Sequence, residues 1–74
     1  MSRLCDLKKG EKAVVLGIED KETAKRLSVL GFLSGEPVTC ALKSPFGGTA
    51  AYFTRGALMA LRREDAVKVA VRSL

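Results

Sequence analysis

The segment 26–35 constrains the fold most, because a helical apolar pattern ends there at one glycine and a strand-like pattern begins after another. The apolar positions, three residues apart, are Ala24, Leu27 and Leu30, so a helix that begins near Lys21 carries all three on one face. Gly31 follows at the position where helices often end in the left-handed backbone region, which costs glycine little. The segment therefore predicts a short helix, a glycine cap and a turn at Gly35.

The acidic residues near position 20 fit the beginning of this helix. Asp20 has a side chain suited to capping the first amide groups, and Glu22 lies in the first turn, where the helix dipole favours negative charge. Glu19, Asp20 and Glu22 could instead be read as metal ligands, but capping explains them without a metal. We therefore expect no metal site at this position.

Alternating apolar patterns predict five short strands separated by glycine, proline and charged turns. The expected strands are residues 12–18, 36–43, 49–55, 57–62 and 67–72. The loop 44–48 contains one proline and two glycines, so the strands on either side should pair as a hairpin. Residues 63–66 are expected to form a short polar turn.

A chain of 74 residues allows one domain, spanning residues 1–74. Its apolar fraction of 47% is sufficient for a compact core, and 28% charged residues is typical of a globular chain. Five strands and one helix fit a mainly β fold, a small and strongly bent antiparallel barrel whose one short helix lies between the first and second strands.

The cysteines and the apolar runs bear on the compartment. Cys5 and Cys40 form no CxxC pair, so we expect reduced, buried thiols, with a bridge between two chains through Cys5 as the alternative. No apolar run approaches the roughly 20 residues of a membrane helix, and residues 1–6 lack the apolar middle of a secretory signal. We expect a cytoplasmic protein that does not insert directly into a membrane.

The sequence predicts no enzyme. It contains no histidine, no serine or cysteine with a recognisably spaced base, and no phosphate-binding glycine pattern. Two separated thiols and scattered carboxylates predict no cofactor and only weak binding of transition metals. A binding module remains as the functional class.

Three motifs follow one another along the chain. They are Arg26-Leu27-Ser28 with Leu30-Gly31 and Gly35, then Ser44-Pro45 with Gly47, and finally Ala60-Leu61-Arg62 with Glu64 and Ala66. Together they resemble the ferrous iron transport protein A family (FeoA) over nearly the whole chain. The resemblance implies an SH3-like barrel and a cytoplasmic accessory role beside the ferrous iron transporter, a membrane protein with a cytosolic GTP-binding domain. It implies neither enzyme activity nor a dedicated iron site.

The chain departs from this family pattern at two places. Ser34 stands where the family usually has proline, and Gly48-Thr49 stands where it usually has Asp-Pro. The second change removes a charge and a rigid residue from the loop between two strands. A partner contact through that loop is therefore not carried over from the family.

Basic residues are in excess in the second half of the chain. Residues 1–37 hold seven basic and six acidic side chains, whereas residues 38–74 hold six basic and two acidic. Some small barrels bind nucleic acid through basic side chains interleaved with aromatic ones, which makes a nucleic-acid-binding module the alternative function. Only Tyr52, Phe53 and Arg55 show such interleaving, so we expect a protein partner and no nucleic acid.

The residues expected to bind the partner are Leu27, Phe46, Phe53 and Arg55. The resemblance places Ala50 and Tyr52 inward, which turns Phe53 and Arg55 outward by the two-residue period of a strand. The reverse assignment, with Phe53 in the core, stays open, and Leu27 is either a core residue under the helix or a contact with the transporter. Apolar residues on both strand faces leave a homodimer open as well.

Overall fold

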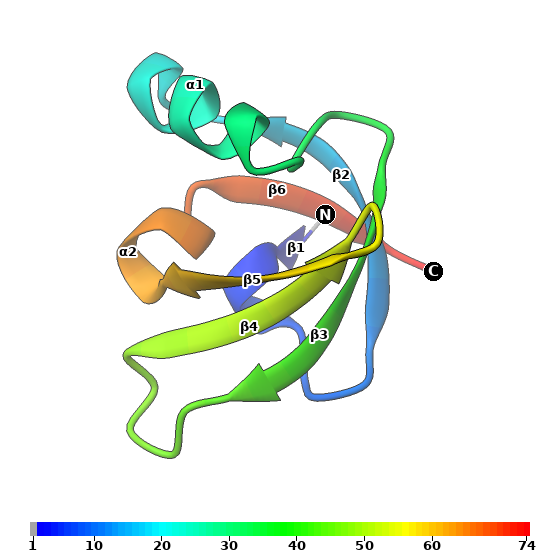
Figure 1. The fold of residues 1–74 in the computed structure, drawn as a ribbon, viewed down its shortest axis with the longest axis vertical. Helices are drawn as coiled ribbons and strands as arrows, with labels where there is room; N and C mark the ends of the chain where they lie inside the picture. The colour runs from blue at the N-terminus through cyan, green and yellow to red at the C-terminus, as the bar shows by residue number, and fades with distance from the viewer. Residues whose placement is uncertain (1) are drawn as a thin grey trace.

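The computed structural model describes residues 2–74 and consists of one antiparallel sheet that bends round on itself (Figure 1). The strands are β1 (Ser2–Arg3), β2 (Lys12–Ile18), β3 (Pro37–Lys43), β4 (Thr49–Thr54), β5 (Ala57–Arg62) and β6 (Val69–Ser73). Their order in the sheet is β1-β6-β2-β3-β4-β5, which puts β5 at an edge. The 3-10 helix η1 (Leu4–Asp6) and the helices α1 (Lys21–Val29) and α2 (Arg63–Ala66) connect the strands. Within residues 2–74, no helix has the length and apolar character needed to cross a membrane.

The mainly β prediction is confirmed, with differences at the end strands. Strands β2 and β5 have the predicted bounds. The two residues of β1 pair with β6 but are too few to show a periodic pattern, so this strand was not predicted. Residues 63–66 form one turn of helix rather than a polar turn, and the helix cap at Val67 delays the start of β6 to Val69.

Both ends of α1 are closed by the predicted residues. At the start, Asp20 Oδ2 accepts hydrogen bonds from the Thr23 amide at 3.3 Å and from Thr23 Oγ1 at 2.8 Å, and these bonds lower the pKa of the Asp20 carboxyl. At the end, Gly31 has a φ of 102° and its amide donates to Ser28 O at 3.1 Å. The Phe32 amide donates to Leu27 O at 3.0 Å, which completes a Schellman motif.

This helix end leads directly into the core. Phe32 and Tyr52 are both 1% exposed, and their rings meet edge to face with centroids 6.4 Å apart. The Tyr52 hydroxyl donates to Leu4 O at 3.4 Å, so the ring also connects β4 with the N-terminal segment. Leu27 packs in the same core from α1.

The two cysteines are buried and free, as predicted. Burial raises the pKa of the Cys40 thiol above its ordinary value. Cys5 is 7% exposed, so the alternative of a bridge between chains through Cys5 has no accessible sulfur to support it.

We predict that Gly31→Val lowers the free energy of unfolding by about 1–2 kcal/mol, because a β-branched residue is forced into the left-handed region. A Cβ at this position would also lie 3.4 Å from Cδ of Arg55. Chemical denaturation measures the change. Gly17→Val is the control, since a Cβ on Gly17 has no heavy atom within 4 Å and its φ is ordinary. Equal stabilities of the two variants would contradict the cap.

We predict that Tyr52 titrates at a pKa of about 12, raised mainly by burial. An unfolded tyrosine titrates near pH 10, so the contribution of this burial to stability is complete below about pH 10 and is lost as the pH rises towards 12. Absorbance titration is direct, since Tyr52 is the only tyrosine and the chain has no tryptophan. In Tyr52→Phe this absorbance change should vanish. A native titration at the ordinary pKa would contradict the burial.

Candidate functional site

Strand β4 divides its aromatic residues between core and surface. Tyr52 is buried, whereas Phe53 is 47% exposed, because neighbouring side chains of a strand point to opposite faces. Ala50 is buried on the same side as Tyr52, and Arg55 is exposed. The inward and outward assignment made from the sequence is therefore confirmed, and the reverse assignment with Phe53 in the core is wrong.

Cross-strand pairing surrounds Phe53 with further apolar side chains. Phe53 lies opposite Thr39 of β3 and Leu58 of β5. In a second row, Ala51 lies opposite Leu42 and Ala60. We call the convex surface formed by Leu42, Ala51, Phe53, Leu58 and Ala60 the outer patch. Its three large residues, Leu42, Phe53 and Leu58, are all exposed.

The sequence reasoning missed Leu58 as a surface residue and left the face of Leu42 open, since either Ala41 and Lys43 or Leu42 can lie beside Phe53 depending on the register. Residues 42 and 40 share a face in a regular strand, but a bulge between Cys40 and Leu42 leaves Cys40 buried and Leu42 57% exposed. The sequence did contain a signal for the exposure of Leu58. The two-residue turn at Arg55-Gly56 pairs Thr54 with Ala57, and the next pair is Phe53 with Leu58, so Leu58 lies on the same face as Phe53.

Arg55 lies in the turn at one end of the outer patch. It is the only non-glycine residue among 2–74 with positive φ, 53°, and Gly56 follows with 78°. Its Nη1 lies 3.6 Å from Glu36 Oε1, and its side chain packs beside Gly31. Such a surface ion pair contributes roughly 0–1 kcal/mol, so the guanidinium stays available to a partner.

Leu27 and Phe46 lie away from the outer patch. Leu27 is 1% exposed, which establishes the core interpretation and makes the interpretation of Leu27 as a surface contact wrong for this structure. Phe46 is 96% exposed in the loop between β3 and β4, at the opposite end of β4 from Arg55. The structure therefore brings Phe53 and Arg55 together and keeps Phe46 apart.

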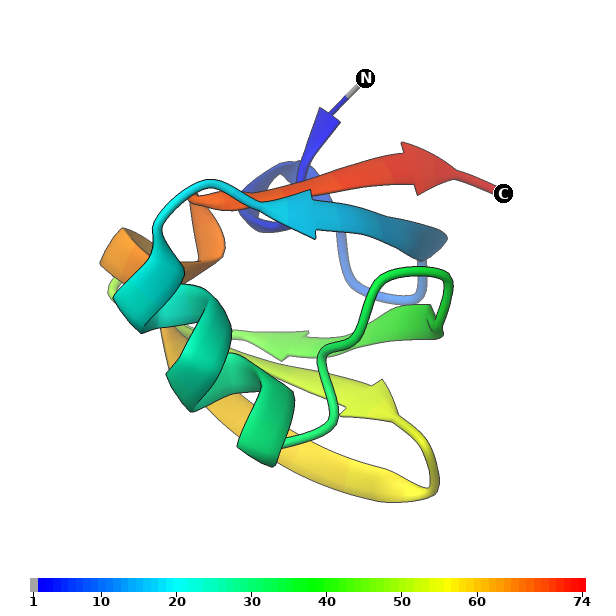
Figure 2. The ribbon, with the colours of Figure 1, turned by 90° about the horizontal axis from the view of Figure 1, so that it is seen from above.

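A groove is lined by α1 on one side and by β5 and α2 on the other. Figure 2 shows the ribbons of these elements. Its volume is about 840 Å³, and its lining includes Val29 and Leu30 of α1 and Ala60 and Leu61 of β5. Charged side chains at the α2 end form two ion pairs, Arg26 with Asp65 at 3.1 Å and Arg62 with Glu64 at 3.5 Å.

The groove is lined by apolar and charged side chains, whereas the large side chains of the outer patch are apolar. Among residues 2–74, no set of three or more histidine, cysteine, aspartate or glutamate side chains gathers in a way that could hold a metal ion. Fold and surface together define the class of small SH3-like barrels, here with an exposed apolar face.

Residues 2–73 match the FeoA domain family, and the chain belongs to that family. Among curated proteins, none matches the chain. The family is an accessory component of ferrous iron transport, which agrees with the resemblance found in the sequence.

Solved structures agree with this assignment. FeoA from Chlorobium tepidum has a TM-score of 0.89 and 27% identity, with 97% of this chain and 70% of that chain covered. FeoA from Stenotrophomonas maltophilia, solved with zinc and described as an SH3 domain protein with a suggested role as a ferrous iron transport activating factor, has a TM-score of 0.83 and 33% identity over 96% of this chain and 89% of that one. A manganese-dependent transcriptional repressor shares the fold, with a TM-score of 0.90 and 19% identity over 99% of this chain but 36% of its own.

We predict that the purified protein has no stoichiometric micromolar site for ferrous iron, since it has no histidine and no gathered set of ligands in residues 2–74. Anaerobic calorimetric titration with Fe²⁺ measures this. The protein in 6 M guanidinium serves as the control for scattered carboxylates. One tight equivalent of iron in the folded protein alone would contradict the prediction.

Proposed function

We propose that this protein is a non-enzymatic accessory protein of ferrous iron uptake that binds the cytosolic GTP-binding part of the ferrous iron transporter. The contact surface is the outer patch, with Arg55 at its end. One observation carries the proposal, namely that Phe53 is exposed on the middle strand of an apolar surface, with Leu58 beside it on β5. Membership of the FeoA family supplies the transport system.

The outer patch has the chemistry of an interaction hot spot. Complete burial of a Phe or Leu side chain stabilises a complex by about 1.5–3 kcal/mol, and Phe53, Leu58 and Leu42 lie on adjacent strands. Because β3 and β5 pair with β4 on both sides, the backbone that carries these side chains is already held in place, which lowers the entropic cost of binding. Arg55 adds one of the residue types that are enriched in hot spots. Phe46 offers a separate contact in the loop between β3 and β4, at the opposite end of β4 from Arg55.

The alternative of a nucleic-acid-binding module loses its main support. Stacking requires exposed aromatic rings interleaved with basic side chains, and Tyr52 is buried in the core. Phe53 then lies among apolar neighbours, and Arg55 is paired with Glu36. Binding to a cytoplasmic protein partner is the function that these surfaces support best.

We predict that Phe53→Ser leaves the protein folded and weakens its binding to the transporter's cytosolic GTP-binding part at least about tenfold, because the largest exposed side chain of the patch is lost. Calorimetry with the purified cytosolic part, with and without nucleotide, measures the affinity. Leu16→Ser is the matched control, since Leu16 is 43% exposed on β2 and lies outside the patch.

Two further variants complete this test. Leu27→Gln should lose binding only through unfolding, since it puts an amide into the core. Phe46→Ser measures the separate contact of the loop. A folded Phe53→Ser protein that binds as tightly as Leu16→Ser would contradict the proposed surface.

A further inference from the structure

The pairing of β5 with β4 shows which residues of β5 direct unpaired backbone groups to its free edge. Arg55 and Gly56 form a two-residue turn with positive φ at both positions, so Thr54 and Ala57 close the hairpin as a hydrogen-bonded pair. Such pairs recur at every second residue of an antiparallel ladder. Arg63 follows Ala57 by six residues, so the same alternation directs its amide towards the β4 side. This amide donates to Gly48 O at 3.1 Å, as expected.

The intervening residues of β5 therefore point their backbone groups away from β4. These residues are Leu58, Ala60 and Arg62, and their amide and carbonyl groups lie along an edge with which no strand of residues 2–74 pairs. An edge of this kind is a template for one additional strand. The opposite edge of the sheet is β1, which is only two residues long.

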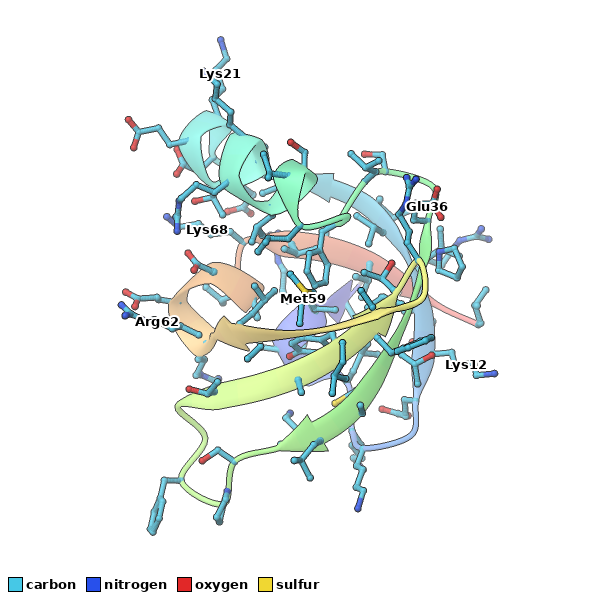
Figure 3. All side chains as sticks on the ribbon, viewed as in Figure 1. Lys12, Lys21, Glu36, Met59, Arg62 and Lys68 are labelled. Carbon is cyan, nitrogen blue, oxygen red and sulfur yellow. The ribbon has the colours of Figure 1, made fainter. Side chains whose placement is uncertain are left out.

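The groove described above adjoins the end of this free edge nearest α2, where Ala60, Leu61 and Arg62 line it. Helix α1 forms its other side, and Val29 and Leu30 contribute apolar surface to it. Met59 extends from β5 on the α1 side, whereas Arg62 and Lys68 lie near the α2 end (Figure 3). A volume of about 840 Å³ is within the range of ligand-binding pockets. An extended segment would thus find backbone partners on β5 and apolar contacts on α1.

We propose that β5 binds an extended segment of the protein partner as an additional strand, in the groove between β5 and α1. The segment has apolar side chains at the alternate positions that face α1. This inference rests on the proposed function, because the segment is assigned to the transporter's cytosolic part. It adjoins the outer patch through Leu58 and Ala60, so one partner can cover both surfaces.

The basic side chains that line the groove are already paired with carboxylates of this chain. Arg26 lies 3.1 Å from Asp65 and Arg62 lies 3.5 Å from Glu64. Lys68 Nζ lies 3.6 Å from Asp20 Oδ2. The unpaired backbone edge of β5 and the apolar surface of α1, rather than charge, therefore define the segment that fits here.

A second copy of this chain fits the groove less well. Its β5 would have to approach the edge together with its own α2, which follows Arg62 directly, and with its own α1 across the groove. A single extended segment carries no such attached helices. We therefore assign the groove to a partner segment and let the test detect self-association.

Amide hydrogen exchange measured by NMR tests this inference. The ¹⁵N-labelled protein is compared alone and with the transporter's purified cytosolic GTP-binding part. We expect exchange at Leu58, Ala60 and Arg62 to slow at least about tenfold, and exchange at Met59 and Leu61, whose amides already bond to β4, to change less. Ala60→Pro should weaken binding at least about tenfold, because it removes one amide of the free edge and none of the β4 ladder.

Matched variants separate the causes. Ala60→Ser keeps the amide and should bind like the native chain. If thermal denaturation shows that Ala60→Pro is not folded, the binding of Arg62→Glu is compared with that of Arg72→Glu instead. Both variants change the net charge equally, and only Arg62 lines the groove. Weaker binding of Arg62→Glu alone supports docking in the groove, and equal binding of the two variants refutes it.

The outcomes that overturn the inference differ from one another. Tight binding of the cytosolic part with unchanged exchange along the β5 edge refutes the added strand and leaves the proposed function intact. Absence of binding by the native protein refutes the proposed function and this inference with it. Slowed exchange at the edge that depends on protein concentration, without partner, assigns the groove to a second copy.

Discussion

The architecture depends on how the chain reverses at the end of α1. Gly31 in the left-handed region allows the Phe32 amide to bond back to Leu27 O, and the Phe32 ring then turns into the core against Tyr52. One motif thus closes the helix, buries an aromatic ring and directs the chain towards β3. The cap also fixes the end of α1, where Val29 and Leu30 form part of one side of the groove.

Strand β4 shows how a very small barrel can carry a surface for binding. Its inward residues, Ala50 and Tyr52, belong to the core, while the outward Phe53 lies on the exposed face. The inner face of β4 and its pairing on both sides hold the strand in place, so the fold does not require a particular residue on the outer face. The phenyl ring of Phe53 therefore lies outside the core that supports its strand.

The sequence predicted those parts of the fold that depend on local patterns. Alternation gave the bounds of β2 and β5, and capping chemistry gave both ends of α1. Features that depend on pairing partners were left open or missed. The exposure of Leu42 arises from a bulge opposite β4, and β1 exists only because β6 offers it an edge.

The candidate site divides in the same way. The outward position of Phe53 was predicted from strand period and family resemblance, because it depends on local alternation, whereas Arg55 is exposed in the turn that follows the strand. Leu27 lies on a helix face whose burial depends on the rest of the core, so its sequence allowed two interpretations until the structure placed it inside. The groove joins α1 to β5, which are far apart in the chain, and no local pattern indicates it.

The placement of the chain ends has a consequence for modular use of this fold. Strands β1 and β6 are neighbours, and Ser2 pairs with Val71, so both ends leave the barrel on the side opposite β5 in the strand order (Figure 2). Another domain can be fused at either end without covering the β5 edge. This arrangement suits a barrel that also occurs as about a third of a larger repressor chain, where the fold covers 36% of the length.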